Sequence, residues 1–297
     1  MAVRREAART CGGAGPCRRG SMGCMTDQAQ RYDRIARGYA RWWAPVLAPT
    51  AVTVLDRIAP LVDAGARRIL DLGTGTATLA VAAIRRWPEV KVVGIDASSG
   101  MAAAARGEAD RQLGPADRRR FSVEVAFADR LPFRDGELDA AVSSFVLQLV
   151  PNRNAALREV HRVVRPGGRM AHVTWLVGDR AFRPDIEVDR VLDDAGIGAR
   201  EPEVRRGDYA SVAAAAVGLR RAGFRAVQAE GRDLVHPFDA RSYQGFIEEF
   251  DEEDLFSSMG RVERRRISGQ LRARLGALPP AAFELRLPVV VAHGDRP

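Results

Sequence analysis

Two glycines and an aspartate lie where an apolar run gives way to a helical pattern. Asp71, Gly73 and Gly75 belong to the stretch DLGTGTA, which also contains Thr74. Glycines let the backbone turn sharply and approach a ligand, and the N-terminus of the following helix offers N–H groups without intrahelical partners. A dinucleotide-binding loop uses this arrangement for a pyrophosphate, but its third glycine is absent here because Thr78 stands in that place. The carboxylate two residues before Gly73 would repel a pyrophosphate and suits an ammonium or another cationic group.

Two further carboxylates are expected at the ends of neighbouring strands. Asp96 lies 21 residues beyond Gly75 and ends the run KVVGID, and Asp129 follows the next strand-like run. The first can accept hydrogen bonds from both hydroxyls of a ribose, and the second from the exocyclic amine of an adenine. Together with Asp71, these carboxylates describe a ligand that has an amine, a ribose and an adenine. S-adenosylmethionine has all three groups.

The elements that position these side chains alternate along the chain. Strands are expected at 68–72, 91–96, 121–127, 138–144 and 169–175, with a turn at 165–168 and helices at 78–87, 97–113 and 152–164. Further helices are expected at 28–43, 49–63, 181–195, 209–222 and 239–274, and further strands at 224–231 and 285–293. This alternation predicts parallel βαβ units with right-handed crossovers, and hence an open, doubly wound α/β sheet. Such sheets bind ligands at the carboxyl ends of their strands.

Five segments occur in a fixed order within about residues 30–178. They are ILDLGTGTA, VVGIDAS, AFADRLPF, LDAAVSSFVLQL and, before a strand, LREVHRVVRPGG. In this order and spacing they resemble the motifs of the class I S-adenosylmethionine-dependent methyltransferase family, specifically its bacterial small-molecule type. The resemblance implies a Rossmann-like, doubly wound sheet of seven strands, mostly parallel with the last strand antiparallel, plus a helical lid. The segment LRLPVVVAHG fits the antiparallel strand.

The resemblance also implies which residues hold S-adenosylmethionine as the cofactor. Asp71 and the loop of Gly73, Thr74 and Gly75 should hold the methionine part, and Asp96 should hold the ribose. Ala77 replaces a third glycine of many relatives, and a small residue suffices there.

Other residues should surround the adenine and close the site. Tyr39 matches an N-terminal aromatic residue that closes over the cofactor in relatives, and Ser143 should lie beside the ligand at the end of the fourth strand. The residues expected in or at the edge of the adenine pocket are Ala97, Met101, Ala128 and Asp129.

Composition and charge bear on the partners. The chain has 297 residues and a net charge of +8, but Lys91 is the only lysine among its 46 basic residues, and residues 1–25 carry five arginines against one glutamate. A bias of this kind often reflects genome composition, so a nucleic-acid partner is not favoured. No apolar run approaches the roughly 18 residues that a membrane span needs, which predicts no membrane span and a cytoplasmic protein. A homodimer is one option for the assembly.

The predicted organisation has three parts. Residues 1–25 are expected to be a disordered tail, 26–178 the cofactor-binding core with N-terminal helices, and 179–297 the lid helices and completing strands of the same domain. All three cysteines (Cys11, Cys17 and Cys24) lie in the tail without a histidine nearby, so no metal site is expected.

The acceptor is narrowed mainly by motifs that are missing. SSFV follows the fourth strand in place of an Asn/Asp-Pro-Pro-aromatic motif, and the body of the chain has no cysteine nucleophile. A small organic acceptor remains, quinone-like or a secondary metabolite, methylated on O, N or C. The aromatic residues expected to line its pocket are Trp175, Phe182, Tyr243 and Phe246.

No residue identifies itself as a general base, so the catalytic residue is unknown. A structural role is favoured for His161 and His172. Three alternatives stay open: a methyltransferase acting on RNA, a non-catalytic S-adenosylmethionine-binding regulatory protein, and an NAD-dependent oxidoreductase.

Overall fold

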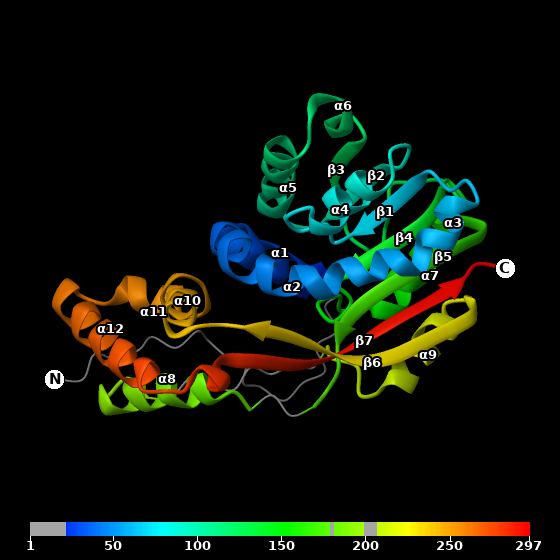
Figure 1. Ribbon diagram of the computed structural model, residues 1–297. Helices are drawn as coiled ribbons and strands as arrows, with labels where there is room; N and C mark the ends of the chain where they lie inside the picture. Colours follow the sequence, from blue (N-terminus) through cyan, green and yellow to red (C-terminus); the bar gives the residue numbers. More distant parts are fainter. Residues whose placement is uncertain (1–21, 179–180, 199–206) are drawn as a thin grey trace.

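The computed structural model describes residues 22–178, 181–198 and 207–297, with side chains from residue 29 onward (Figure 1). Of the predicted disordered tail, residues 1–21, with Cys11 and Cys17, lie outside the described residues. Residues 22–25 belong to the first helix.

The described residues form a seven-stranded sheet in the order β3-β2-β1-β4-β5-β7-β6. Neighbours from β3 to β5 pair in parallel, whereas β7 runs antiparallel to both β5 and β6, which confirms the predicted fold class. The strands are β1 (Arg68–Leu72), β2 (Lys91–Asp96), β3 (Phe121–Val125), β4 (Leu138–Ser144), β5 (Val164–Trp175), β6 (Arg225–Pro237) and β7 (Glu284–Asp295). The order reverses between β1 and β4, so the carboxyl ends of these two strands form the switch point where such sheets bind ligands.

The strands β3, β5, β6 and β7 differ from their predicted bounds, and β5 and β6 differ most. The segment 165–168, expected as a turn, lies inside β5, where the pairing with β4 shifts register between Leu138 and Ala140. A Cβ atom at Gly168 would lie 2.3 Å from the carbonyl oxygen of Asp139, so glycine is required where the two strands come close. Strand β6 continues to Pro237, beyond the predicted end at 231, because it pairs with β7 along its length.

Helices cover both faces of the sheet. One face packs against α3 (Leu55–Asp63), α4 (Thr78–Arg86) and α5 (Ser99–Gln112), and the other against α7 (Arg153–Val163) and α9 (Val212–Arg221). Their buried residues recur at helical spacing, as in α7, so each helix turns one apolar stripe to the strands. The short helix α6 (Pro115–Arg118) precedes β3.

A helical stretch leads from the N-terminal side into the sheet. It comprises α1 (Met22–Gly38), the π-helical segment η1 (Tyr39–Trp43), α2 (Ala44–Ala51), the 3₁₀ turn η2 (Val52–Val54) and α3. Within the described residues it contains one span, Ala29–Asp63, that is long and apolar enough to cross a membrane by length and composition, with 39% of its most apolar window buried. The sequence pattern did not predict this span. The core helix of a soluble protein meets the same criterion of length and composition, so the span is weak evidence for a membrane.

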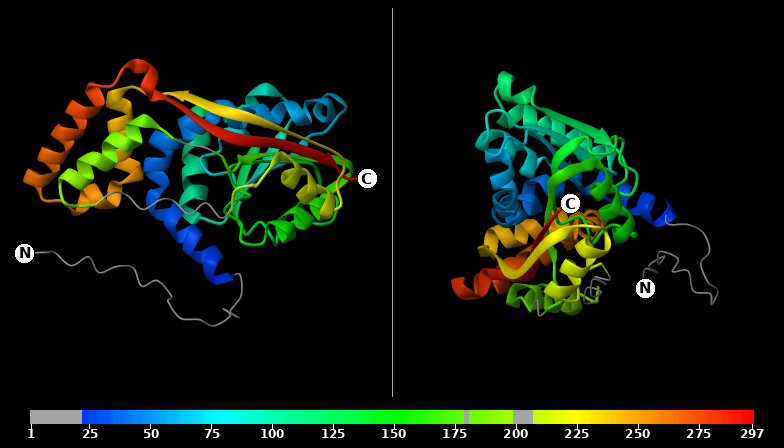
Figure 2. Two further views of the ribbon diagram at one scale, coloured as in Figure 1. Left: turned by 90° about the horizontal axis from the view of Figure 1, so that it is seen from below. Right: turned by 90° about the vertical axis from the view of Figure 1, so that its right-hand side faces the viewer.

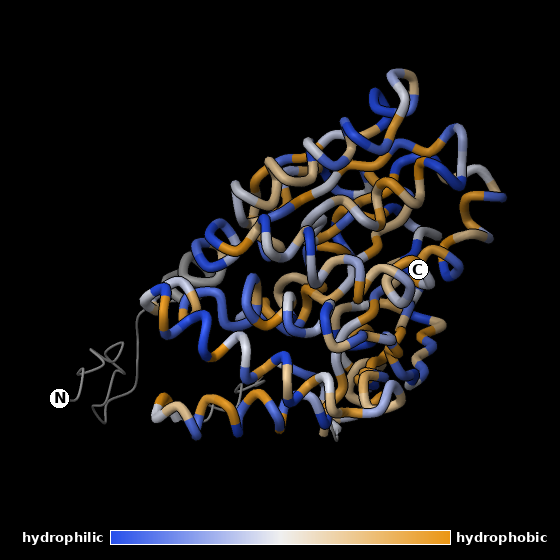
Figure 3. The backbone as a smooth tube through the Cα atoms, turned by 60° about the vertical axis from the view of Figure 1, so that its left-hand side comes forward, coloured by the Kyte–Doolittle hydropathy of each residue, from blue (hydrophilic) through white to orange (hydrophobic). Residues whose placement is uncertain are grey.

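The two long strands β6 and β7 carry a helical arm away from the sheet (Figures 1 and 2). The arm consists of α8 (Arg183–Asp194), α10 (Ala240–Phe246), the π-helical segment η3 (Ile247–Asp251), α11 (Glu253–Ser258), α12 (Arg261–Gly276) and the 3₁₀ turn η4 (Pro280–Phe283). Hydrophilic and hydrophobic residues alternate along the outer helices of the molecule, as expected for helices with one buried face (Figure 3). The residues 239–274, predicted to be helical, form several short elements.

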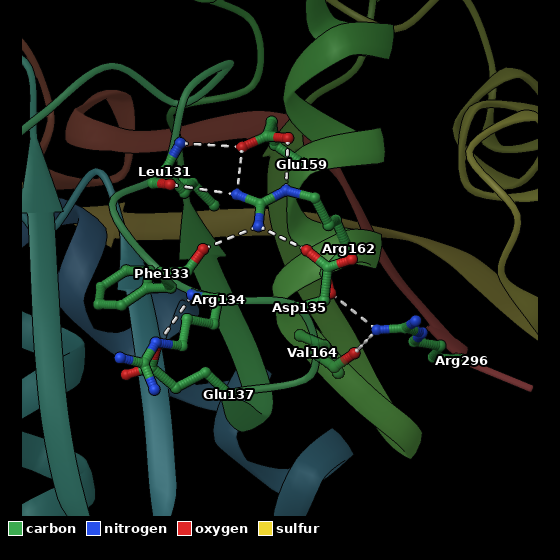
Figure 4. A network of polar contacts seen from close by, with 9 residues as sticks. All are labelled: Leu131, Phe133, Arg134, Asp135, Glu137, Glu159, Arg162, Val164 and Arg296. Carbon is green, nitrogen blue, oxygen red and sulfur yellow. Dashed lines mark hydrogen bonds and ion pairs between the residues drawn. The ribbon is translucent and has the colours of Figure 1, made fainter.

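A polar network ties α7 to the loop before β4 (Figure 4). The guanidinium of Arg162 donates to the carbonyl oxygens of Leu131 and Phe133 and pairs with Glu159 and Asp135. Glu159 also accepts a hydrogen bond from the Leu131 amide. The Arg162 side chain therefore fixes this loop together with backbone hydrogen bonds, among them that from the Gly136 amide to the carbonyl oxygen of Arg162.

Candidate active site

The glycine loop after β1 is held against β2 by backbone hydrogen bonds. The N–H groups of Gly73 and Thr74 both donate to the carbonyl oxygen of Ile95, at 2.7 and 2.9 Å. Gly73 and Gly75 have φ angles of +70° and +53°. A Cβ atom at Gly73 would lie 2.1 Å from a side-chain carbon of Val146, so both conformation and space require glycine there.

Ala77 occupies the position just before α4 in a left-handed conformation, with φ of +61°. The family resemblance described above implies a third glycine at this position. Alanine is small enough to fit, and its side chain is fully buried. A left-handed conformation is less favourable for alanine than for glycine, so Ala77 forms this turn at a cost in conformational free energy.

Asp71 lies behind the loop, not in the wall of a cavity. Its side chain is 1% exposed and accepts a hydrogen bond from Thr74 Oγ1 at 2.8 Å. Burial raises the pKa of Asp71 to about 7, although bonds from Thr74 and the Ala80 amide oppose the effect. A cation bound over the loop would stabilise the ionised form of this buried carboxyl.

Asp96 ends β2 beside the same loop. Its carboxylate accepts hydrogen bonds from the backbone N–H groups of Gly75 and Ser98, both at 2.9 Å. Burial raises the pKa of Asp96 in spite of these bonds. The carboxylate therefore joins the glycine loop to the start of α5.

A small cavity of about 120 Å³, here called the strand-end cavity, opens at the carboxyl ends of β1, β2 and β4. Most of the sequence-predicted site residues line it, and the set is Tyr39, Gly73, Gly75, Asp96, Ala97, Met101 and Ala128. Other residues of the wall were not predicted from the sequence, among them Tyr32, Ser98, Phe127, Ser144 and Phe145.

Four predicted residues do not line the strand-end cavity. Asp71 is buried behind the loop, the side chain of the loop residue Thr74 is hydrogen-bonded to it, and Asp129 is partly buried next to Ala128. Ser143 is fully buried and donates to the carbonyl oxygen of Leu72 at 2.8 Å, so the adjacent Ser144 faces the cavity instead. The pleat of β4, which turns successive side chains to opposite faces, accounts for this difference.

Helix α1 is fastened to the start of α5. Asp33 Oδ1 accepts hydrogen bonds from Ser98 Oγ at 2.6 Å and from the Gly100 amide at 2.7 Å. These bonds hold the pKa of Asp33 below its ordinary value. They also keep Tyr32 and Tyr39 over the strand-end cavity.

A second cavity of about 1070 Å³, here called the aromatic cavity, lies between the sheet and the arm. All four predicted acceptor-pocket residues line it: Trp175, Phe182, Tyr243 and Phe246. Trp43 joins them, with its ring 5.4 Å from that of Phe246 and 6.4 Å from that of Trp175.

The two cavities share part of their walls. The residues that line both are Tyr32, Tyr39, Phe145, Leu149, Val150 and Pro151. Phe145 has a φ angle of +55°, which is uncommon for an aromatic residue, and its ring packs 4.4 Å from that of Trp175. A ligand in one cavity thus meets a ligand in the other across a few side chains.

The π-helical segments η1 and η3 meet at this junction although about 200 residues separate them. Tyr39 of η1 packs edge-on against Phe250, with ring centroids 6.3 Å apart, and Trp42 Nε1 donates to Glu249 at 3.2 Å. Burial raises the pKa of the Tyr39 hydroxyl, and nearby Tyr32 and Asp96 raise it further. Tyr39 therefore stays protonated and can act as a hydrogen-bond donor.

Comparison with known proteins gives consistent results. A family model described as a methyltransferase domain matches residues 69–168. The malonyl-[acyl-carrier protein] O-methyltransferase of Geobacter sulfurreducens is 32% identical over 219 residues, which cover 72% of this chain and 77% of that protein.

Other matches cover less or are more distant. The ubiquinone/menaquinone biosynthesis C-methyltransferase of Syntrophotalea carbinolica is 36% identical over 48% of this chain, which spans about half of that protein (55%). The structure of Haemonchus contortus phosphoethanolamine N-methyltransferase 2 in complex with S-adenosyl-L-methionine matches with a TM-score of 0.55 and 16% identity, covering 92% of this chain and 59% of that one. At this identity the likeness concerns the fold alone.

Proposed function

Because the chain belongs to the class I S-adenosylmethionine-dependent methyltransferases, we propose that it transfers the methyl group of this donor to a small organic acceptor in the aromatic cavity. One observation carries the proposal: the strand-end cavity and the aromatic cavity share a wall formed by Tyr32, Tyr39 and the segment that follows β4. A donor and an acceptor bound there lie side by side, as a displacement reaction requires.

The chemistry of the strand-end cavity suits the donor. Asp96 presents a carboxylate for the ribose hydroxyls, and Met101, Ala97 and Ala128 offer an apolar wall for the adenine. Asp129 follows Ala128 in the chain and lies outside this lining, and its place at the edge of the adenine pocket stays a prediction. The positive φ angles of Gly73 and Gly75 bring backbone rather than side chains to the methionine part.

The remaining predicted residues act from behind this wall. Asp71 supplies negative charge beneath the loop, since a cationic ligand favours its ionised form. Thr74 orients that carboxylate, and Ser143 fixes the end of β1 through its bond to Leu72.

The cavity must enlarge to admit the donor. Sites for ligands of drug size have volumes of about 300–1,000 Å³, whereas the strand-end cavity has about 120 Å³. Helix α1, which carries Tyr32 and leads into Tyr39, forms one wall and is fastened to α5 through Asp33. We propose that this segment moves aside for binding and then closes over the cofactor.

The methyl transfer itself is an in-line displacement. When bound, the donor would supply the methyl group of its sulfonium: the S–CH₃ bond breaks and its electron pair stays on sulfur as a thioether. The acceptor atom forms the new bond, and any proton that this atom carries passes to water. The protein's own residues hold the acceptor and exclude water through the rings of Trp43, Phe145 and Trp175. No side chain is assigned as a general base.

The acceptor class follows from the walls and the relatives. The aromatic lining suits a quinone-like or similar apolar acceptor, and the relatives named above act, by their names, on a malonyl-carrier protein and on quinone precursors. Family membership leaves no support for the oxidoreductase alternative. The absence of a nucleic-acid partner, the homodimer, the cytoplasmic location and the three-part domain organisation stay predictions.

Calorimetric titration of the purified protein with S-adenosylmethionine and its demethylated product tests the cofactor site. We expect micromolar binding of both, weakened at least tenfold in Asp96→Ala and unchanged in Asp110→Ala, an acid on the outer side of α5 that forms an ion pair with Arg118. Binding without methyl transfer to any acceptor in a labelled-methyl screen would favour the regulatory alternative. Transfer to RNA would favour the RNA alternative, and no binding at all would contradict the proposal.

A further inference from the structure

Arg153 is a cation in the wall of the aromatic cavity without an acidic partner among the described residues. Its Nε donates to the carbonyl oxygen of Leu147 at 2.9 Å, and its Nη2 donates to that of Gly207. These bonds fix the guanidinium in place but leave it other N–H donors and its full charge. A partly buried cation without a counter-ion is costly, so it favours an anion in the cavity.

Tyr209 lies directly beneath this guanidinium. Arg153 Cζ is 3.9 Å from the ring centroid, and the tyrosine also lines the aromatic cavity. Tyr209 is 5% exposed, and burial raises the pKa of its hydroxyl while the contact with Arg153 opposes that effect. No acceptor in the described part of the chain takes the proton of this hydroxyl. This hydroxyl lies beside Gly218, another residue of the cavity wall, at 3.3 Å from the position of a Cβ atom there. A buried donor in such a place lacks an acceptor.

His172 completes a stack below Tyr209, with ring centroids 6.0 Å apart and planes 23° apart. Burial and the nearby Arg153 lower the pKa of His172 to about 3, so the imidazole stays neutral. His172 therefore brings no positive charge, and the cationic residues that line the aromatic cavity are Arg31, Arg153 and Arg221, of which Arg153 is the one stacked on Tyr209.

Two further features set the charge of this end of the cavity. Asn152, Arg153 and Asn154, at the start of α7, line the cavity, and the N-terminus of an eleven-residue helix favours negative charge. Three carboxylates also line the cavity, those of Asp185, Asp208 and Asp251, and each interacts with other residues. Asp185, for example, accepts a hydrogen bond from the hydroxyl of Tyr243.

We infer that the methyl acceptor carries a carboxylate, which binds between Arg153 and the hydroxyl of Tyr209 while its apolar body lies against the aromatic rings. The inference rests on the proposed function, because it assigns the chemistry of the acceptor in the same cavity. Arg153 lies two residues from Pro151, which lines both cavities, so the carboxylate is bound on the side of the methyl donor.

The test compares two probes of equal shape, 2-naphthoate and 2-naphthamide, by calorimetric titration of the protein saturated with S-adenosylhomocysteine. We expect the wild type to bind the carboxylate at least tenfold more tightly than the amide. Arg153→Met should bring the two affinities within twofold of each other, and Tyr209→Phe should weaken naphthoate binding about threefold or more. Arg158→Met is the matched control because Arg158 is exposed on the same helix and outside the cavity wall, so the preference should persist.

Several outcomes would overturn the inference. They are equal affinities of the two probes for the wild type, no binding of naphthoate at millimolar concentration, and a preference that survives in Arg153→Met. The titration of S-adenosylhomocysteine is read separately, so a failure there counts against the cofactor site while the naphthoate comparison in its absence still tests the carboxylate site. Should Arg153→Met fail to fold, the wild-type comparison and Tyr209→Phe decide the question.

Discussion

The substitution Asp71→Asn tests the electrostatics beneath the glycine loop. Burial raises the pKa of this carboxyl to about 7 in the folded protein, against about 3.9 in an unfolded chain. Between these values the folded state binds more protons than the unfolded state, so the stability of the wild type falls as the pH rises from about 4 to about 7. Ionising the carboxyl in place costs roughly 4 kcal/mol at most, at 1.36 kcal/mol for each pKa unit.

Asparagine has nearly the same shape and cannot ionise. The free energy of unfolding of Asp71→Asn minus that of the wild type should therefore grow between pH 5 and pH 8, by up to about 3 kcal/mol. Every other titrating group, including Asp96 with its raised pKa, contributes equally to both proteins and largely cancels from this difference. Urea denaturation at the two pH values measures it.

Ligand binding should show the opposite trend. A cationic methionine part favours the ionised carboxyl, so the affinity of the wild type for S-adenosylmethionine should rise up to tenfold for each pH unit below 7 and level off above it. Asp71→Asn should lack that component of the pH dependence.

The stability measurement decides the argument. If the difference in the free energy of unfolding between Asp71→Asn and the wild type changes by less than about 0.5 kcal/mol between pH 5 and pH 8, burial does not control this carboxyl.

Three further predictions concern the supports of the site. Gly73→Ala should lower stability by about 3 kcal/mol in urea denaturation, since a Cβ atom would clash with Val146 at a positive φ; a loss under about 1 kcal/mol would mean that the loop adapts. Arg162→Met should cost about 2 kcal/mol because five polar contacts are lost, and a cost near zero would show that solvent replaces them. Asp33→Ala should raise the Kd for S-adenosylmethionine about fivefold, because the cap that fastens α1 to α5 is worth about 1 kcal/mol; an unchanged Kd in calorimetry would separate α1 from binding.

Much of the fold was predictable from local patterns. The runs at 68–72, 91–96 and 138–144 are strands with the predicted bounds, because apolar composition and flanking glycines signal buried parallel strands. The irregular parts were not predictable in this way. The helical region expected at 239–274 contains the π-helical segment η3 and a break before α12, and Gly245 in this region packs against the distant Trp42.

The candidate site divides along a similar line. Asp96, Gly73 and Gly75 could be found because each stands at a fixed distance from the end of a strand, and the topology brings strand ends together. The sequence does not distinguish the adjacent Ser143 and Ser144, because the pleat of β4 decides which of them lines the strand-end cavity.

By itself, then, the sequence determined the order of strands and helices, the glycine loop and the carboxylates that follow the strands, because these depend on residues close together in the chain. Only the tertiary structure decided that Tyr39 meets Phe250 and that Arg153 lies over Tyr209. It also decided that the two cavities share one wall. Those contacts join segments far apart in the chain, and side-chain packing between distant elements leaves no periodic signal in the sequence.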